Sequence, residues 1–239
     1  MHLLAVTPGQ ISDGSEAVDL GQTPGDIVVL SAADSELTGL AEALGGREEG
    51  FPSLRLANLM QLGHNLSVDI YVDEVVSRAR LVIVRLLGGV GYWPYGIEQI
   101  SEACRRAGVA LAVLPGDDQP DAELAGLCTV APEAAHRLWQ YLVHGGRENY
   151  RNALGFAASL LGHEGAWLEP VPLLRAGIYW PGLRQPTLED VQANWTAAWP
   201  VAPLVFYRAL LQAGNLAPVD DLVAALVDVW GDLSLKWAA

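Results

Sequence analysis

The sequence predicts an α/β fold built on a parallel β-sheet, and two observations carry this prediction. The first is the apolar run Leu81–Val84, which precedes Arg85 and the glycine-rich stretch G-G-V-G. A short apolar run bounded by glycines is typical of a strand that is buried on both faces. The second is the helical spacing of apolar residues after it, because a strand followed by a helix is the repeating unit of parallel sheets.

The first half of the chain repeats this pattern. Short apolar segments with the length of strands occur at His2–Val6, Asp26–Leu30, Leu54–Leu59, Leu81–Val84 and Val109–Leu114. Helical spacing follows three of them: a helix begun by Asp34 or Ser35 and stopped by Gly45, a helix capped by Ser67, and a helix over about 97–107. We therefore expect residues 1–130 to form a flavodoxin-like or Rossmann-type domain.

The pattern changes after Asp117. Residues 132–161 predict two helices that break at Gly145-Gly146, so residues 131–170 are expected to be a helical connector. Strands are expected at Leu173–Trp180 and Leu204–Leu210, and an amphipathic helix at Pro218–Val229. Residues 171–239 are therefore expected to begin a second α/β domain that is apparently truncated.

The composition excludes several classes of function. The chain has 239 residues, 51% of them hydrophobic, and a net charge of −14, which disfavours binding to nucleic acid or anionic membranes. Its two cysteines, Cys104 and Cys128, form no metal or disulfide motif. No signal peptide and no apolar run of about 18 residues is present. A cytoplasmic protein without a membrane span is expected.

The loop after Arg85 is the first candidate site. Ligands of open α/β sheets bind beyond the carboxyl ends of the strands, where this loop places Tyr92, Trp93 and Tyr95. Phosphate binding is disfavoured, because G-x-x-x-x-G-K-[ST] is absent and Lys236 is the only lysine. Two interpretations remain. Either the aromatic residues simply pack over the sheet edge, or they face a flat apolar ligand with Arg85 as a clamp for its carboxylates or amides.

Metal-binding candidates are fewer. His64 follows an expected strand and is either a metal ligand or a hydrogen-bonded surface residue. Asp117 and Asp118 follow a Pro-Gly turn and either bind a hard cation or are solvated. His136 and His144 lie eight residues apart on one expected helix, about 12 Å along its axis, and are too distant to share a metal.

Several stretches resemble the amino-terminal region of the large subunit of aerobic cobaltochelatase, which is related to the porphyrin-binding subunit of magnesium chelatase. The resemblance extends to about Val227, whereas residues 228–239 depart from the family pattern as if truncated. It is carried by Leu54–His64, Val84–Gly96, Leu114–Asp118, Leu138–Gly146, Leu174–Gly182 and Val205–Asp220.

This resemblance implies insertion of Co²⁺, as a substrate, into the corrin ring of hydrogenobyrinic acid a,c-diamide during cobalamin biosynthesis. ATP and Mg²⁺ would act through partner AAA+ subunits, no cofactor would be bound permanently, and the catalytic residues would lie beyond this chain. Arg85, Tyr92, Trp93 and Tyr95 would contact the tetrapyrrole, and His64 would hold the incoming metal. The alternatives are a magnesium chelatase large subunit, which inserts Mg²⁺ into protoporphyrin IX, or a non-catalytic subunit-interaction module.

Overall fold

A four-stranded parallel sheet forms the centre of the computed structural model, which describes residues 16–195 and 201–237. The strand order is β2-β1-β3-β4, and Ile27 of β1 lies level with Leu54 of β2 and Leu81 of β3. The expected strand at His2–Val6 lies outside the described residues. The strands are β1 (Ile27–Ser31), β2 (Leu54–Asn58), β3 (Leu81–Leu86) and β4 (Ala110–Pro115).

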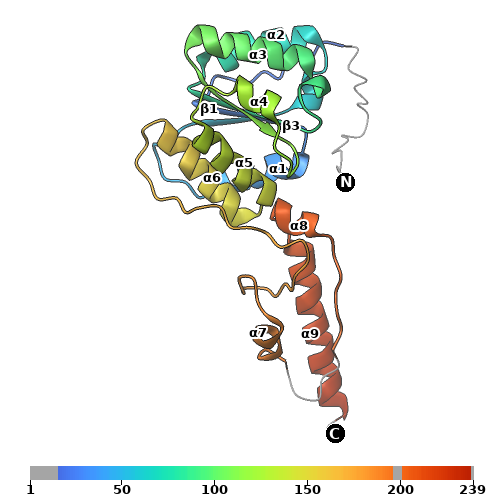
Figure 1. Cartoon of the computed structure of the whole chain (residues 1–239). Helices are drawn as coiled ribbons and strands as arrows, with labels where there is room; N and C mark the ends of the chain where they lie inside the picture. The colour runs from blue at the N-terminus through green and yellow to red at the C-terminus, as the bar shows by residue number, and fades with distance from the viewer. Residues whose placement is uncertain (1–15, 196–200, 238–239) are drawn as a thin grey trace. The chain divides into compact units, whose positions relative to one another are not determined.

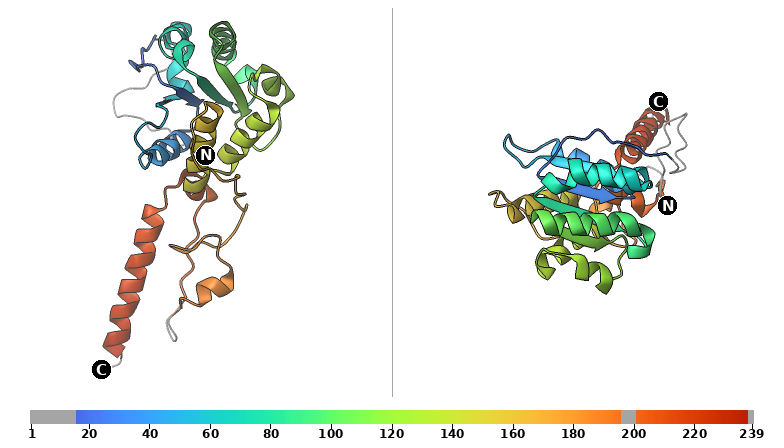
Figure 2. Two further views of the ribbon diagram at one scale, coloured as in Figure 1. Left: turned by 90° about the vertical axis from the view of Figure 1, so that its left-hand side faces the viewer. Right: turned by 90° about the horizontal axis from the view of Figure 1, so that it is seen from above.

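Helices cover both faces of this sheet. Helices α2 (Asn65–Glu74) and α3 (Pro94–Ala107) lie on one face, and α1 (Asp34–Leu44), α5 (Pro132–His144) and α6 (Arg147–Leu160) lie on the other (Figures 1 and 2). Shorter elements join them: η1 (Leu59–Leu62), η2 (Val76–Arg78), η3 (Val90–Tyr92) and α4 (Ala122–Leu127).

The apolar runs of the strands explain this three-layer arrangement. Successive side chains of a strand point to opposite faces of the sheet. Each apolar strand therefore contributes side chains to both hydrophobic cores. Val82 and Val84 of β3 pack in the core beneath α2 and α3, whereas Leu81 and Ile83 pack in the core beneath α1, α5 and α6. Helices α5 and α6 thus complete one face of the sheet. The domain limits expected from the sequence remain a proposal.

Each border of the sheet forms hydrogen bonds with a segment outside it. Along β4, the N–H groups of Thr129 and Val130 donate to the carbonyl of Leu111, and the hydroxyl of Thr129 accepts from the N–H of Leu111. Along β2, the side-chain amide of Gln22 donates to the carbonyl of Leu56. Segments outside the sheet therefore satisfy backbone groups that border strands would otherwise expose.

The described chain divides into two compact units between Pro172 and Leu173. The second unit holds α7 (Leu188–Gln192), α8 (Arg208–Ala213) and α9 (Ala217–Trp237). The strands expected at Leu173–Trp180 and Leu204–Leu210 are wrong: the first is irregular, and the second runs into α8. An apolar, β-branched segment becomes a strand only where another strand pairs with it, and the described part of this unit offers none.

No helix within residues 16–195 and 201–237 has both the length and the apolar character needed to cross a membrane.

Asp26 joins the start of β1 to the start of β2. Its carboxylate accepts hydrogen bonds from the hydroxyl (2.6 Å) and the N–H (2.9 Å) of Ser53, and these bonds hold the pKa of Asp26 below its ordinary value of 3.8. A depressed pKa stabilises the fold above pH 3.8, and this contribution is lost as the pH falls through the lower, folded-state pKa.

We therefore expect Asp26→Asn to be less stable than the wild type at neutral pH, with the difference in free energy of unfolding shrinking toward about pH 2. Urea unfolding of both proteins at neutral and acidic pH measures this. A difference that does not change with pH would show that the charge of Asp26 has no part in it.

Candidate functional site

The loop between β3 and α3 is held in place by close packing of its backbone. Gly88 and Gly89 have positive φ angles of 96° and 73°, which glycine adopts without steric cost. A β-carbon on Gly116, just after β4, would come within 2.7 Å of the Leu87 backbone. Two glycine-dependent turns therefore meet at the carboxyl edge of the sheet.

The three aromatic residues of this loop differ in what they contact. Trp93 is buried, and its Nε1 donates a hydrogen bond of 3.0 Å to the carbonyl of Leu62. The hydroxyl of Tyr95 donates to Asp69 (2.7 Å), a bond that raises the pKa of Tyr95. Tyr92 is 44% exposed, and its hydroxyl lies 3.3 Å from Sδ of Met60. Of the three, Tyr92 alone offers a substantial part of its ring to a ligand.

Arg85 does not join this group, which corrects the expected arrangement. It follows Leu81 and Ile83 in the alternation of β3 and faces α1 and α5, whereas Trp93 packs in the core on the opposite face. Its Nη1 forms an ion pair with Glu36 of α1, and its guanidinium donates to the carbonyls of Pro115, Gly116 and Leu142.

The surroundings of Arg85 are those of a structural residue. Burial lowers the pKa of Arg85 to about 10, which still leaves it charged at neutral pH. Its side chain and that of Glu36 are 11% and 3% exposed. Because backbone carbonyls and Glu36 already take its donors, Arg85 is not placed to clamp a carboxylate from solution.

The N-cap of α2 is His64, whereas the sequence predicted Ser67 in that position. Its Nδ1 accepts a hydrogen bond of 3.1 Å from the N–H of Leu66, and this interaction caps the helix. Within the described parts of the chain, no group of three or more His, Cys, Asp or Glu residues is arranged to hold a metal ion. A metal-binding role for His64 stays a prediction.

Asp117 and Asp118 form a polar turn after β4. Oδ1 of Asp117 accepts from the N–H of Gln119 (3.1 Å), and Oδ1 of Asp118 accepts from the side chain of the same residue (3.1 Å). The carbonyl of Asp117 also accepts a bond from Nε1 of Trp139 on α5. These contacts fix the turn to α5.

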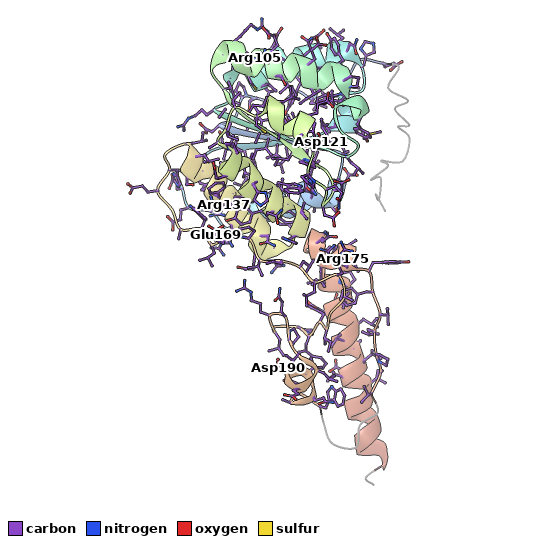
Figure 3. All side chains as sticks on the ribbon, in the orientation of Figure 1. Arg105, Asp121, Arg137, Glu169, Arg175 and Asp190 are labelled. Atoms are coloured by element: carbon purple, nitrogen blue, oxygen red, sulfur yellow. The ribbon has the colours of Figure 1, made fainter. Side chains whose placement is uncertain are left out.

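An open depression along α5 includes the guanidinium of Arg137 in its lining, and this guanidinium also packs against two aromatic rings outside that lining. Nε of Arg137 donates to Oε2 of Glu169 (2.9 Å), and the two side chains approach each other from α5 and the segment after α6 (Figure 3). The guanidinium carbon lies 5.0 Å from the ring centre of Phe156 and 5.2 Å from that of Trp167. The depression is lined by Pro132, Glu133, His136, Arg137, Gln140, Glu169 and Pro170.

This depression and the rings beside Arg137 have the chemistry that the sequence predicted for Arg85 and its aromatic loop. Arg137 is 30% exposed, its face is stacked on rings, and its Nε is held by Glu169. A guanidinium fixed in this way loses little freedom when its remaining N–H groups bind a planar anion such as a carboxylate. Sequence reasoning missed it because Glu169 and Trp167 lie some thirty residues from Arg137, and no motif joins them.

Comparisons with known proteins agree with this architecture. Residues 139–229 match the family model described as CobN/Magnesium Chelatase. The aerobic cobaltochelatase subunit CobN of Pseudomonas aeruginosa is 45% identical over 221 residues, which cover 91% of this chain. The chain belongs to the CobN/magnesium chelatase family. The resemblance to the cobaltochelatase large subunit is thus confirmed.

Further relatives extend this result. The aerobic cobaltochelatase subunit CobN of a Sinorhizobium species is 44% identical over 234 residues, or 95% of this chain. The catalytic subunit of cobaltochelatase from Mycobacterium tuberculosis matches 84% of the chain with a TM-score of 0.61 and 26% identity. This likeness and the parallel sheet confirm the α/β fold. The chain spans 17%, 18% and 15% of these three proteins.

Proposed function

We propose that this chain is a tetrapyrrole-contacting part of a cobaltochelatase large subunit. In the reaction, Co²⁺ is the metal substrate, hydrogenobyrinic acid a,c-diamide is the ring, and partner AAA+ subunits hydrolyse ATP. The observation that carries the proposal is the identity of 45% and 44% with two cobaltochelatase subunits over nearly the whole chain. The absence of a P-loop motif from the sequence agrees with ATP hydrolysis on other subunits.

The depression along α5 supports a role in holding the substrate. A corrin of this kind carries carboxylate and carboxamide arms, which are the planar groups that a guanidinium binds best. Arg137 is fixed by Glu169 and by two aromatic rings, and it lines an open depression on the surface of α5. We propose that Arg137 binds one carboxylate arm of the ring.

The aromatic loop is a second proposed contact. Tyr92 offers an exposed ring, Trp93 and Tyr95 hold the loop in place, and His64 at the same edge of the sheet is the proposed ligand for the incoming metal. Apolar contact with a macrocycle needs such exposed aromatic area. Arg85 has no part in this contact because it lies on the opposite face of the sheet.

Arg137→Gln tests the substrate contact. We expect the variant to bind hydrogenobyrinic acid a,c-diamide about tenfold more weakly than the wild type, because one charge-assisted contact is lost. Quenching of tryptophan fluorescence measures binding, since Trp167 lies beside Arg137. Arg105→Gln is the matched control, because Arg105 is an exposed arginine that also pairs with a glutamate.

If Arg137→Gln bound the corrin as tightly as the wild type, Arg137 would have no part in substrate binding. The Tyr92→Ala variant would then test the contact of the aromatic loop. If the wild type binds no tetrapyrrole at micromolar concentrations, the substrate-contacting function itself is wrong. Preference for protoporphyrin IX over the corrin would favour a magnesium chelatase large subunit.

A role as an interaction module is a second candidate, and one observation favours it. The second unit exposes many large apolar side chains, which an isolated protein surface rarely does.

A further inference from the structure

The turn after β2 and the loop after β3 lie against each other at the carboxyl edge of the sheet. Leu59 and Leu62 of η1 pack in the same hydrophobic core as Trp93, which follows η3. Nε1 of Trp93 donates a hydrogen bond of 3.0 Å to the carbonyl of Leu62. Beside it, the hydroxyl of Tyr92 donates to Sδ of Met60 at 3.3 Å. The side chains of Met60 and Tyr92 are therefore in direct contact.

Met60 and Tyr92 are both exposed, although both side chains are largely apolar. Met60 is 53% exposed and Tyr92 is 44% exposed. Scattered apolar residues are common on protein surfaces, but these two adjoin and present one apolar area. The thioether of methionine is polarisable and adapts to irregular apolar partners, and methionine recurs at binding surfaces for this reason. Covering this area would release a favourable free energy that the chain alone does not gain.

The backbone of Met60 is fixed by two polar side chains. Its N–H donates to Oδ1 of Asn58 (2.8 Å), which ends β2 and caps η1. The side-chain amide of Asn58 donates in turn to Oδ1 of Asp34, the first residue of α1 (2.6 Å). The bond from the Tyr92 hydroxyl to the sulfur of Met60 restrains both side chains further. Side chains that are already ordered lose less conformational entropy when a ligand binds to them.

The place of this pair in the fold is one where ligands bind. Met60 follows β2 and Tyr92 follows β3, and these strands lie on either side of β1. The chain passes from β1 to β2 and then crosses to β3, so the direction of winding reverses at β1. Ligands of open α/β sheets bind beyond the carboxyl ends of the strands at such a reversal.

We propose that Met60 is a substrate-contacting residue, whose thioether and the ring of Tyr92 together cover part of one apolar face of the tetrapyrrole. This inference rests on the proposed function, because it takes the tetrapyrrole as the ligand at this edge. The faces of a tetrapyrrole are apolar and wider than a single phenol ring. A tyrosine ring and an adjoining thioether cover more of such a face than the ring alone, and sulfur packs well against conjugated rings.

NMR of the chain labelled with [methyl-¹³C]methionine tests the contact directly. The chain contains two methionines, so the Met60→Leu variant identifies the signal of Met60 by its loss. We expect this signal to shift on titration with hydrogenobyrinic acid a,c-diamide, because a conjugated ring against the methyl group changes its shielding. The shift should follow the same concentration dependence as the quenching of tryptophan fluorescence.

Affinities measured by that quenching test whether the contact contributes to binding. We expect Met60→Ala to bind the corrin about fivefold more weakly, because apolar contact area is lost. Met60→Leu keeps the volume and the apolar character and should stay within about twofold of the wild type. Leu160→Ala is the matched control and should not change the affinity, because Leu160 is an exposed apolar residue of α6 on the other face of the sheet.

A further variant separates contact with the ring from positioning of Tyr92. If Met60 acted only by holding Tyr92, Met60→Ala would have no effect once Tyr92 is replaced by alanine. We expect Met60→Ala to weaken binding in the Tyr92→Ala variant as well. No further loss in that variant overturns the proposed contact and makes Met60 a positioning residue.

The outcomes separate this inference from the proposed function. Quenching by the corrin while the Met60 signal stays in place overturns this inference and leaves the proposed function standing. Equal affinity of the wild type and Met60→Ala does the same. If the corrin causes neither quenching nor a shift, the proposed function fails and this inference fails with it. The wild-type titration needs no substitution, so a loss of stability in Met60→Ala does not affect it.

Discussion

Replacing Arg85 with methionine is expected to lower the free energy of unfolding by about 3–5 kcal/mol, because the change leaves the buried carboxylate of Glu36 without its counter-charge. Glu36 is 3% exposed, and its Oε1 already lacks a hydrogen-bond partner in the described structure. Arg85→Met also removes the donors to the carbonyls of Pro115, Gly116 and Leu142. Urea unfolding followed by circular dichroism measures the loss.

Two further variants separate the ion pair from the packing around it. Arg85→Met combined with Glu36→Leu is expected to recover much of the loss, because no unpaired charge stays buried. Arg105→Met breaks an exposed pair with Glu102 and should cost less than about 1 kcal/mol. If Arg85→Met alone lost no more than Arg105→Met, the buried ion pair would have no special weight in this fold.

Gly96→Ala is expected to destabilise the protein by about 2 kcal/mol or more, because a β-carbon at this position would overlap the indole ring of Trp93. The ring has little room to withdraw, since it is buried and its Nε1 is bonded to the carbonyl of Leu62. The variant should also shift the indole N–H resonance of Trp93 in an NMR spectrum. Thermal unfolding and that spectrum together measure the effect.

Gly126→Ala is the matched control, since a β-carbon there has no neighbour within 4 Å and the residue lies in helix α4. Alanine is a better helix former than glycine, so this control should be neutral or slightly more stable. A Gly96→Ala variant as stable as Gly126→Ala would mean that the indole ring of Trp93 can move aside freely.

The sequence was sufficient to predict the parallel sheet, because each of its strands is a short apolar run that is buried on both faces. The run Leu81–Val84 fits that description, and so does Val109–Leu114. The same reasoning failed at Leu173–Trp180, where six of the eight residues are apolar. Apolar content predicts that a segment will be covered, whereas the partner that covers it decides whether the segment becomes a strand.

The expected place of Arg85 in the site was wrong for a related reason. Because side chains of a strand alternate between its two faces, Arg85 must lie on the same face of β3 as Leu81 and Ile83. Nothing in the sequence indicates that Glu36 also lies on that face and pairs with it. Likewise, the pairing of Arg137 with Glu169 depends on how α5 meets the segment after α6. Contacts between distant segments are tertiary facts, and a single sequence carries no direct signal for them.

The hydrogen bonds at the two borders of the sheet also bear on how the protein behaves in concentrated solution. Growth of cross-β fibrils requires a bare strand that can recruit the next molecule, and the Leu111 and Leu56 carbonyls already have donors from their own chain. Any precipitate that forms at high concentration should therefore be amorphous, held together by the exposed apolar side chains of the second unit. The fluorescence of added thioflavin T should not increase during precipitation.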